Sequence, residues 1–137
     1  MTHWSGAYVG LPWRAGGRDA QGCDCWGLVR LIYQDVAKIA LDPLNGLYVT
    51  AEEREDIAAI VAGEMAHGPW FPIEPGAECE LDVLLFRCLG LQSHVGVVAG
   101  RGLMLHATAG QTSCIERYQD GRWRPRLSGI FRHRDAR

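Results

Sequence analysis

Gly22-Cys23-Asp24-Cys25-Trp26-Gly27-Leu28-Val29 decides the fold, because this stretch opens the first amphipathic helix of the chain. From Cys25 onward, apolar residues recur at helical spacing as far as Ile39. Asp24 is a good N-cap residue, which places Cys25 in the first turn. Unpaired backbone N–H groups and the positive end of the helix dipole lie there, and both favour a thiolate over a thiol. Cys25 is therefore a candidate nucleophile. The alternative is a small core residue, since free cysteines are often buried.

Length and composition are those of an ordinary globular protein. The chain has 137 residues, of which 47% are apolar and 22% are charged, so we expect one domain over residues 1–137. The net charge of −2 argues against a nucleic-acid binder, and no apolar stretch is long enough to span a membrane. The N-terminus lacks a basic region followed by an apolar run, so we expect synthesis in the cytoplasm without a signal peptide. Five cysteines cannot all pair within one chain, and reduced thiols are expected.

The order of predicted elements indicates an α+β domain, with N-terminal helices packed on an antiparallel sheet of about five strands. Residues 3–22 read as a structured loop after a short turn, in which Gly16 and Gly17 let the backbone pass close to the next helix. Helices are expected over about 24–40 and 51–67, the second opened by a capping box at Thr50 and Glu53. Residues 70–76 read as a connector. The strands of the sheet, between about 81 and 132, are expected at 81–88, 94–99, 103–107, 112–118 and 127–132.

Two histidines lie on the hairpin of this sheet. His94 begins one expected strand and His106 lies near the end of the next, so both can fall at nearly the same level and point to one face. If the helix that carries Cys25 packs on that face, the three residues converge. Cys25 would then attack a carbonyl, His94 would take its proton and later protonate the leaving amine, and His106 would orient His94. The resting pair would be largely thiolate and imidazolium.

A metal site is the rival interpretation of the same residues. Cys23 and Cys25 with the two histidines offer soft ligands, but Cys-x-Cys is not the usual spacing of structural zinc sites, so no metal and no cofactor are expected. Cys23 is read as a loop thiol, or alternatively as a partner that inactivates Cys25 on oxidation.

Three motifs together resemble the NlpC/p60 family of papain-like cysteine peptidases. They are Asp24-Cys25-Trp26-Gly27-Leu28-Val29, His94-Val95-Gly96-Val97-Val98 and Leu105-His106-Ala107, in the family's order. The family's lead-in resembles Gly10-Leu11-Pro12-Trp13-Arg14-Ala15-Gly16-Gly17, and its Gly-Asp-Leu strand resembles Asp82-Val83-Leu84-Leu85-Phe86, with Leu81 in place of the glycine. The resemblance implies a papain-like fold with Cys25, His94 and His106 as the catalytic residues.

The resemblance also implies a substrate and a setting. The substrate is the peptidoglycan stem peptide, cut between D-γ-glutamate and a diamino acid. Trp26 in place of serine, with Pro12-Trp13 upstream, is similar to phage tail-associated members and to the peptidases of phage-like gene transfer agents. Such a protein would be a virion component that acts on the cell wall beside other tail or baseplate proteins.

Several residues complete the predicted site. The backbone N–H of Cys25 is the expected oxyanion donor because it lies at the helix start. Many family members carry a tyrosine where this chain has Trp13, whose indole N–H would donate instead or whose ring would only pack. Asp24 and Trp26, which flank Cys25, complete the oxyanion and substrate set.

Two other functions stay open. One is a structural tail-tip or assembly subunit that keeps the fold, and the other is a thiol acyltransferase on the same scaffold. The recurring arginines between Arg117 and Arg137 read either as a solvated edge or as a surface for anionic wall polymer or a neighbouring subunit.

Overall fold

The computed structural model describes residues 3–14, 17–41, 69–88, 91–108 and 110–136. The second expected helix, about 51–67, lies outside these residues. Three short helical segments are a 3-10 turn η1, a π-helical turn η2 and a 3-10 turn η3. The elements in chain order are η1 (Trp4–Tyr8), β1 (Arg18–Asp19), β2 (Gly22–Cys23), α1 (Cys25–Ile32), η2 (Tyr33–Ala37), β3 (Trp70–Pro72), β4 (Val83–Cys88), β5 (Leu91–Gly100), β6 (Leu103–His106), β7 (Cys114–Arg117), η3 (Arg124–Arg126) and β8 (Leu127–His133).

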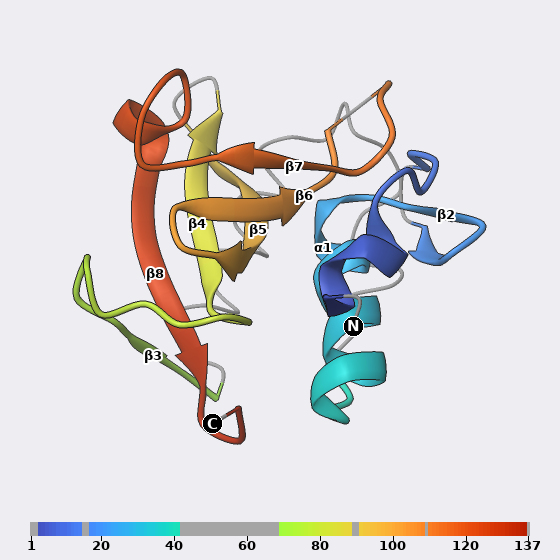
Figure 1. Cartoon of the computed structure of the whole chain (residues 1–137), viewed down its shortest axis with the longest axis horizontal. Helices are drawn as coiled ribbons and strands as arrows, with labels where there is room; N and C mark the ends of the chain where they lie inside the picture. The colour runs from blue at the N-terminus through green and yellow to red at the C-terminus, as the bar shows by residue number, and fades with distance from the viewer. Residues whose placement is uncertain (1–2, 15–16, 42–68, 89–90, 109, 137) are drawn as a thin grey trace.

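The main sheet is antiparallel and confirms the α+β class. Six strands follow the order β3-β8-β4-β5-β6-β7, and β1 pairs with β2 in a separate small hairpin (Figure 1). The sixth strand is β3, which lies where we expected only a connector. It pairs with β8 alone, at the edge of the sheet, where Pro72 removes no essential ladder hydrogen bond. The small hairpin was also unexpected, because Gly16 and Gly17 argued against regular structure there.

Helix α1 begins where the sequence predicts. The Asp24 side chain accepts a hydrogen bond from the backbone N–H of Gly27 at 2.8 Å, which is the expected N-cap. The α-helical part ends at Ile32 and continues as η2 to Ala37, so the helical segment is shorter than the expected 24–40. Lys38 ends it with a left-handed conformation, φ 59°, and its N–H bonds to the carbonyl of Tyr33.

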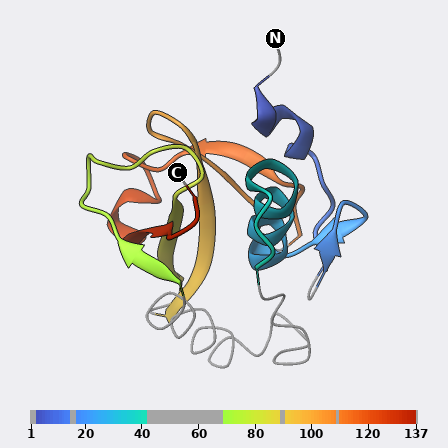
Figure 2. The ribbon, with the colours of Figure 1, turned by 90° about the horizontal axis from the view of Figure 1, so that it is seen from below.

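The two faces of the sheet bury different clusters. On one face, Val95, Val97 and Leu105 pack with the buried side of α1, including Trp26 and Val29. Strand residues of the opposite face form the second cluster together with Tyr118 and Trp123, which lie between β7 and η3. The strand residues of this cluster are Leu84, Phe86, Val98, Met104 and Ile130. Figures 1 and 2 show α1 and the small hairpin on one side of the molecule and β3 and β8 on the other. Each face of the central strands is therefore covered.

The loop before α1 crosses the first turn of the helix at very close range. A Cβ atom added at Gly27 would lie 2.0 Å from the carbonyl oxygen of Gly17, and one added at Gly17 would lie 2.2 Å from the carbonyl oxygen of Gly22. The expected close approach to the helix start is thus confirmed at Gly17, whereas Gly16 lies outside the described residues.

Among the helices of the described residues, none combines the length and the apolar character that crossing a membrane requires.

Gly27→Ala should destabilise the protein, although alanine normally stabilises a helix interior relative to glycine. The added methyl group meets a backbone oxygen that cannot move without shifting the loop, so we expect a loss of about 1–3 kcal/mol in the free energy of unfolding. Chemical denaturation measures it. Gly100→Ala is the matched control, because its nearest neighbour would be the Leu103 side chain at 3.9 Å. Equal stability of the two variants would contradict this close packing.

Candidate active site

Cys25 is the first residue of α1. Its side chain is 8% exposed, and it belongs to the cluster that α1 forms with the sheet. At this position its backbone N–H lies in the first turn, outside the ladder of hydrogen bonds within the helix. Asp24 beside it is buried and caps the helix, so Asp24 acts on the site by fixing this turn.

The structure brings His94 and His106 together. Nε2 of His94 lies 2.9 Å from Nδ1 of His106, and both rings are buried. We expected the two residues at nearly the same level of the hairpin, and this expectation is wrong. Instead, His106 pairs with Gly96, and His94 is its diagonal neighbour two residues along β5. Glycine at position 96 relieves crowding opposite His106, because a Cβ there would lie 3.0 Å from Sδ of Met104 and 3.3 Å from the Cβ of His106.

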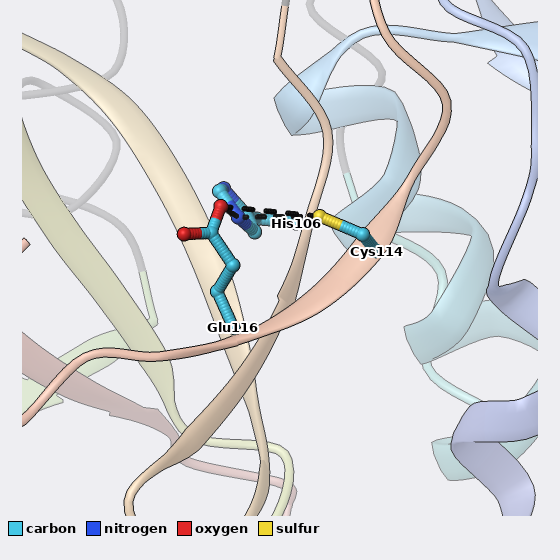
Figure 3. A group of neighbouring side chains, drawn as sticks. All are labelled: His106, Cys114 and Glu116. Carbon is cyan, nitrogen blue, oxygen red and sulfur yellow. Dashed lines mark hydrogen bonds and ion pairs between the residues drawn. The ribbon is translucent and has the colours of Figure 1, made fainter.

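Glu116 on β7 completes this group and was not predicted from the sequence. One oxygen of its carboxylate, Oε1, lies 2.9 Å from Nε2 of His106 and 2.9 Å from Nη2 of Arg122 (Figure 3). The other oxygen accepts a hydrogen bond from the indole N–H of Trp123 at 3.1 Å. The Trp123 ring in turn stacks on His94, with centroids 4.9 Å apart and planes 21° apart. Glu116, His106 and His94 therefore form one chain of hydrogen bonds, held from the side by Trp123.

Burial makes both histidines neutral at neutral pH. Loss of solvent, together with the neighbouring His106, lowers the pKa of His94 to about 3. Burial also lowers the pKa of His106, partly offset by the hydrogen bond to Glu116. Burial alone would raise the pKa of Glu116, but hydrogen bonds from Arg122 and His106 outweigh it and lower that pKa, so Glu116 is ionised. The expected resting imidazolium is wrong for this arrangement.

The carboxylate of Glu116 determines where the protons of both rings lie. An ionised carboxylate only accepts hydrogen bonds, so Nε2 of His106 must carry a proton. Neutral His106 then has a lone pair on Nδ1, which accepts the Nε2–H of His94. Neutral His94 is left with a lone pair on Nδ1. These hydrogen bonds thus leave Nδ1 of His94 able to act as a base.

The thiol and the histidine pair start from opposite faces of the sheet. Helix α1 packs on the face that carries Val95 and Leu105, whereas His94 contacts Phe86 and Trp123 of the other cluster. The expectation that α1 packs on the histidine face is therefore wrong. Because α1 contacts β5 and β6, the helix start and these strands still adjoin. An encounter between Cys25 Sγ and His94 stays a prediction.

The two tryptophans of the predicted substrate set differ. Trp26 has no exposed surface and packs edge-on against Trp70, with centroids 6.4 Å apart, so its side chain belongs to the core. Its place in the oxyanion and substrate set stays a prediction. Trp13 is half-buried and forms an isolated parallel bridge with Cys23, two residues before Cys25. Its role as an oxyanion donor stays a prediction.

Several of the C-terminal arginines have partners within the chain. Arg132 forms two hydrogen bonds to the Asp82 carboxylate, at 2.9 and 2.8 Å. Arg122 and Arg126 lie over the Trp123 ring, 5.0 and 5.4 Å from its centroid. These contacts within the chain favour a structural role for the three arginines over a surface for a binding partner.

A cysteine at a helix start and an oriented pair of imidazoles are the groups from which thiol hydrolases build their sites. Comparison with known proteins agrees with this class. The profile described as NlpC/P60 family matches residues 10–132, and the chain belongs to that family.

Two relatives are informative. The chain is 29% identical over 129 residues to gamma-DL-glutamyl hydrolase of Bacillus subtilis (strain 168), covering 91% of this chain but 27% of that protein, so it spans about a quarter of that relative's length. Among solved structures, the NlpC/p60 domain of peptidoglycan hydrolase SagA has 20% identity and a TM-score of 0.59, with 92% of this chain and 90% of that one covered. An NlpC/P60 family protein from Bacillus cereus ATCC 10987 has 18% identity and a TM-score of 0.66, covering 94% and 37%. At these identities the structures confirm the fold.

The assigned proton positions can be measured directly. Long-range proton–nitrogen correlation spectra of protein labelled with ¹⁵N-histidine should show His94 and His106 both as neutral Nε2–H tautomers, because Glu116 accepts from His106. In Glu116→Gln this preference should weaken, since an amide can donate as well as accept. An Nδ1–H tautomer of His106 in the unmodified protein would contradict the assignment.

Proposed function

We propose that this protein is a cysteine peptidase that hydrolyses an amide bond in peptidoglycan stem peptides. The observation that carries the proposal is the hydrogen-bond chain from Glu116 through His106 to His94, in a chain of the NlpC/P60 family that has Cys25 at a helix start. The chain of hydrogen bonds leaves Nδ1 of His94 able to accept a proton. A base with a lone pair and a nearby thiol are what nucleophilic acyl transfer requires.

The reaction would proceed in two steps. The Cys25 thiol gives its proton to Nδ1 of His94 while Sγ attacks the substrate carbonyl. The backbone N–H of Cys25 stabilises the resulting oxyanion. The amine leaves with the proton from His94, and an acyl-enzyme forms on Sγ. Water then gives a proton to His94 and attacks the acyl carbon, which releases the acid and restores the thiol.

His106 and Glu116 take no proton in this scheme. During the reaction His94 becomes an imidazolium, which a buried site disfavours unless a neighbour stabilises it. The Nε2–H of His94 keeps its bond to His106, and the charge of Glu116 lies one ring further along. The carboxylate therefore stabilises the charged intermediate as well as orienting the rings.

The bond that is cut is a finer part of the proposal. We expect the amide between D-γ-glutamate and a diamino acid, as the resemblance to NlpC/p60 peptidases implies. The likeness to a protein named gamma-DL-glutamyl hydrolase and to a structure described as a peptidoglycan hydrolase supports this choice of substrate.

The setting is a further part of the proposal. Trp26 after the nucleophile and Pro12-Trp13 before it support a component of a phage or phage-like tail, which would act on the cell wall beside other tail or baseplate proteins. The alternative is a structural tail-tip or assembly subunit with catalysis secondary or absent. The buried packing of Trp26 against Trp70 favours a role for Trp26 in the fold in either case.

Cys25→Ala should abolish hydrolysis of purified sacculi, with a fall of at least about 10³-fold, because it removes the sulfur on which the acyl-enzyme forms. Mass spectrometry of the released muropeptides measures both the rate and the bond. Cys114→Ala is the matched control, since Cys114 is a half-buried cysteine whose Sγ lies 3.8 Å from Nε2 of His106 and is not the proposed nucleophile.

Two results of this experiment would contradict the proposal. Equal activity of Cys25→Ala and the unmodified protein would remove Cys25 as nucleophile. Products that carry an added amine in place of water would identify an acyltransferase instead.

The tail assignment has its own test. Particles produced with Cys25→Ala should assemble normally and contain the chain in stoichiometric amount, because the substitution removes one sulfur atom from a site that serves chemistry. Electron microscopy and quantitative mass spectrometry of purified particles measure this. Failure of assembly with a folded variant would favour the structural subunit, and absence of the chain from particles would exclude the tail setting.

A further inference from the structure

A second group of reactive side chains lies on β7 beside His106. Cys114 pairs directly with His106 in the sheet, and its Sγ lies 3.8 Å from Nε2 of that ring. The same Sγ lies 3.9 Å from Oε1 of Glu116, and Oε1 lies 2.9 Å from Nε2. Figure 3 shows the cysteine and glutamate side chains reaching the ring from neighbouring positions of one strand. A nitrogen, a sulfur and an oxygen thus form a triangle at the end of the catalytic chain.

This triangle has the dimensions of a zinc site. With metal–ligand distances of about 2.0–2.3 Å, tetrahedral coordination separates nitrogen, sulfur and oxygen ligands by about 3.3–3.6 Å. The three observed separations differ from that range by a few tenths of an ångström. Imidazole, thiolate and carboxylate are also ligands that zinc accepts. We propose that His106, Cys114 and Glu116 bind a thiophilic divalent cation of the zinc class, and that the bound ion switches the peptidase off.

The site can be reached from solvent. Cys114 is half-buried, and the Glu116 side chain is 29% exposed, so the fourth coordination position can be taken by water. Arg122 shares Oε1 with His106, but its side chain is 58% exposed. An ion pair of such exposure is weak, so an entering cation can displace it.

Metal binding would move the ring protons of both His106 and His94 from Nε2 to Nδ1. The cation takes the lone pair of Nε2 of His106, so that nitrogen can no longer carry a proton. A neutral ring must then carry its proton on Nδ1, which donates to Nε2 of His94. His94 in turn carries its proton on Nδ1, which is the atom that must accept the proton of Cys25. The ion therefore removes the base without touching the nucleophile.

The protons balance in this exchange. Nε2 of His106 loses one proton, Nδ1 of His106 gains the proton of His94 Nε2, and Nδ1 of His94 gains one from solvent. Both rings stay neutral, and the Cys114 thiol releases one proton when it becomes a ligand. One proton is thus released for each cation bound.

The inhibitory half of this inference rests on the proposed peptidase function, so the test reads binding and tautomers as well as activity. Isothermal titration of zinc into the reduced protein should give one site per chain. Cys114→Ser should weaken that site by at least about tenfold, because a hydroxyl replaces the thiolate ligand. Cys79→Ser is the matched control, since Cys79 is an exposed cysteine whose Sγ contacts the carbonyl of Ala77 and is not a ligand of the proposed site.

Tautomer and activity measurements then test the switch. Zinc should convert His94 and His106 from Nε2–H to Nδ1–H tautomers in the unmodified protein and in Cys79→Ser, but not in Cys114→Ser at the same zinc concentration. Hydrolysis of sacculi, normalised for each protein to its own rate with a chelator, should fall in parallel.

The outcomes separate the two proposals. If no condition gives hydrolysis, the peptidase function fails, while binding and tautomer data still decide the metal site. Binding that Cys114→Ser leaves unchanged would overturn the site. Stimulation of hydrolysis by zinc, or binding that leaves the tautomers and the rate unchanged, would overturn the switch.

Discussion

The hydrogen bond between Glu116 and His106 is the interaction on which the rest of the site depends. Because the carboxylate can only accept, Nε2 of His106 donates to it and Nδ1 of His106 is left as an acceptor. His94 must therefore donate to His106 through its own Nε2–H. Arg122 and Trp123 hold the carboxylate, and Trp123 also stacks on His94, so few alternative orientations are open to either ring. Burial keeps both imidazoles neutral. Each neutral ring has one donor nitrogen and one acceptor nitrogen, so the hydrogen bonds from His94 to His106 to Glu116 run in one direction.

The sheet divides the site between two packed layers. Its α1 face secures the helix that presents Cys25, through Val95, Val97 and Leu105. Its other face secures the rings, through Phe86 and Trp123. Nucleophile and base therefore lie on opposite faces of the sheet, and α1 contacts both strands that carry the histidines, β5 and β6. Small shifts between the layers would change the distance across which a proton must pass, so packing on either face affects the chemistry.

Much of this arrangement could be predicted from the sequence, and the exceptions have physical reasons. The capped start of α1, the hairpin and the two histidines follow from local rules of capping and alternation. The edge strand β3 was missed because Pro72 argues against a strand unless its partner is known to lie on one side only. The level of His94 was wrong because β5 and β6 pair residues that lie equally far from Arg101, which puts Gly96 opposite His106 and leaves His94 two residues further along β5. Glu116 was missed because the length of the loop before β7 hides which of its residues face His106.

Site-specific alkylation of Cys25 tests the central claim most directly. Reduced protein is treated with iodoacetamide at neutral pH, and peptide mass spectrometry follows each cysteine separately. If the chain activates the thiol through His94, then His94→Ala and Glu116→Ala should slow the labelling of Cys25 and leave that of the exposed Cys79 unchanged. Labelling of Cys25 at the same rate in all three proteins would contradict the account.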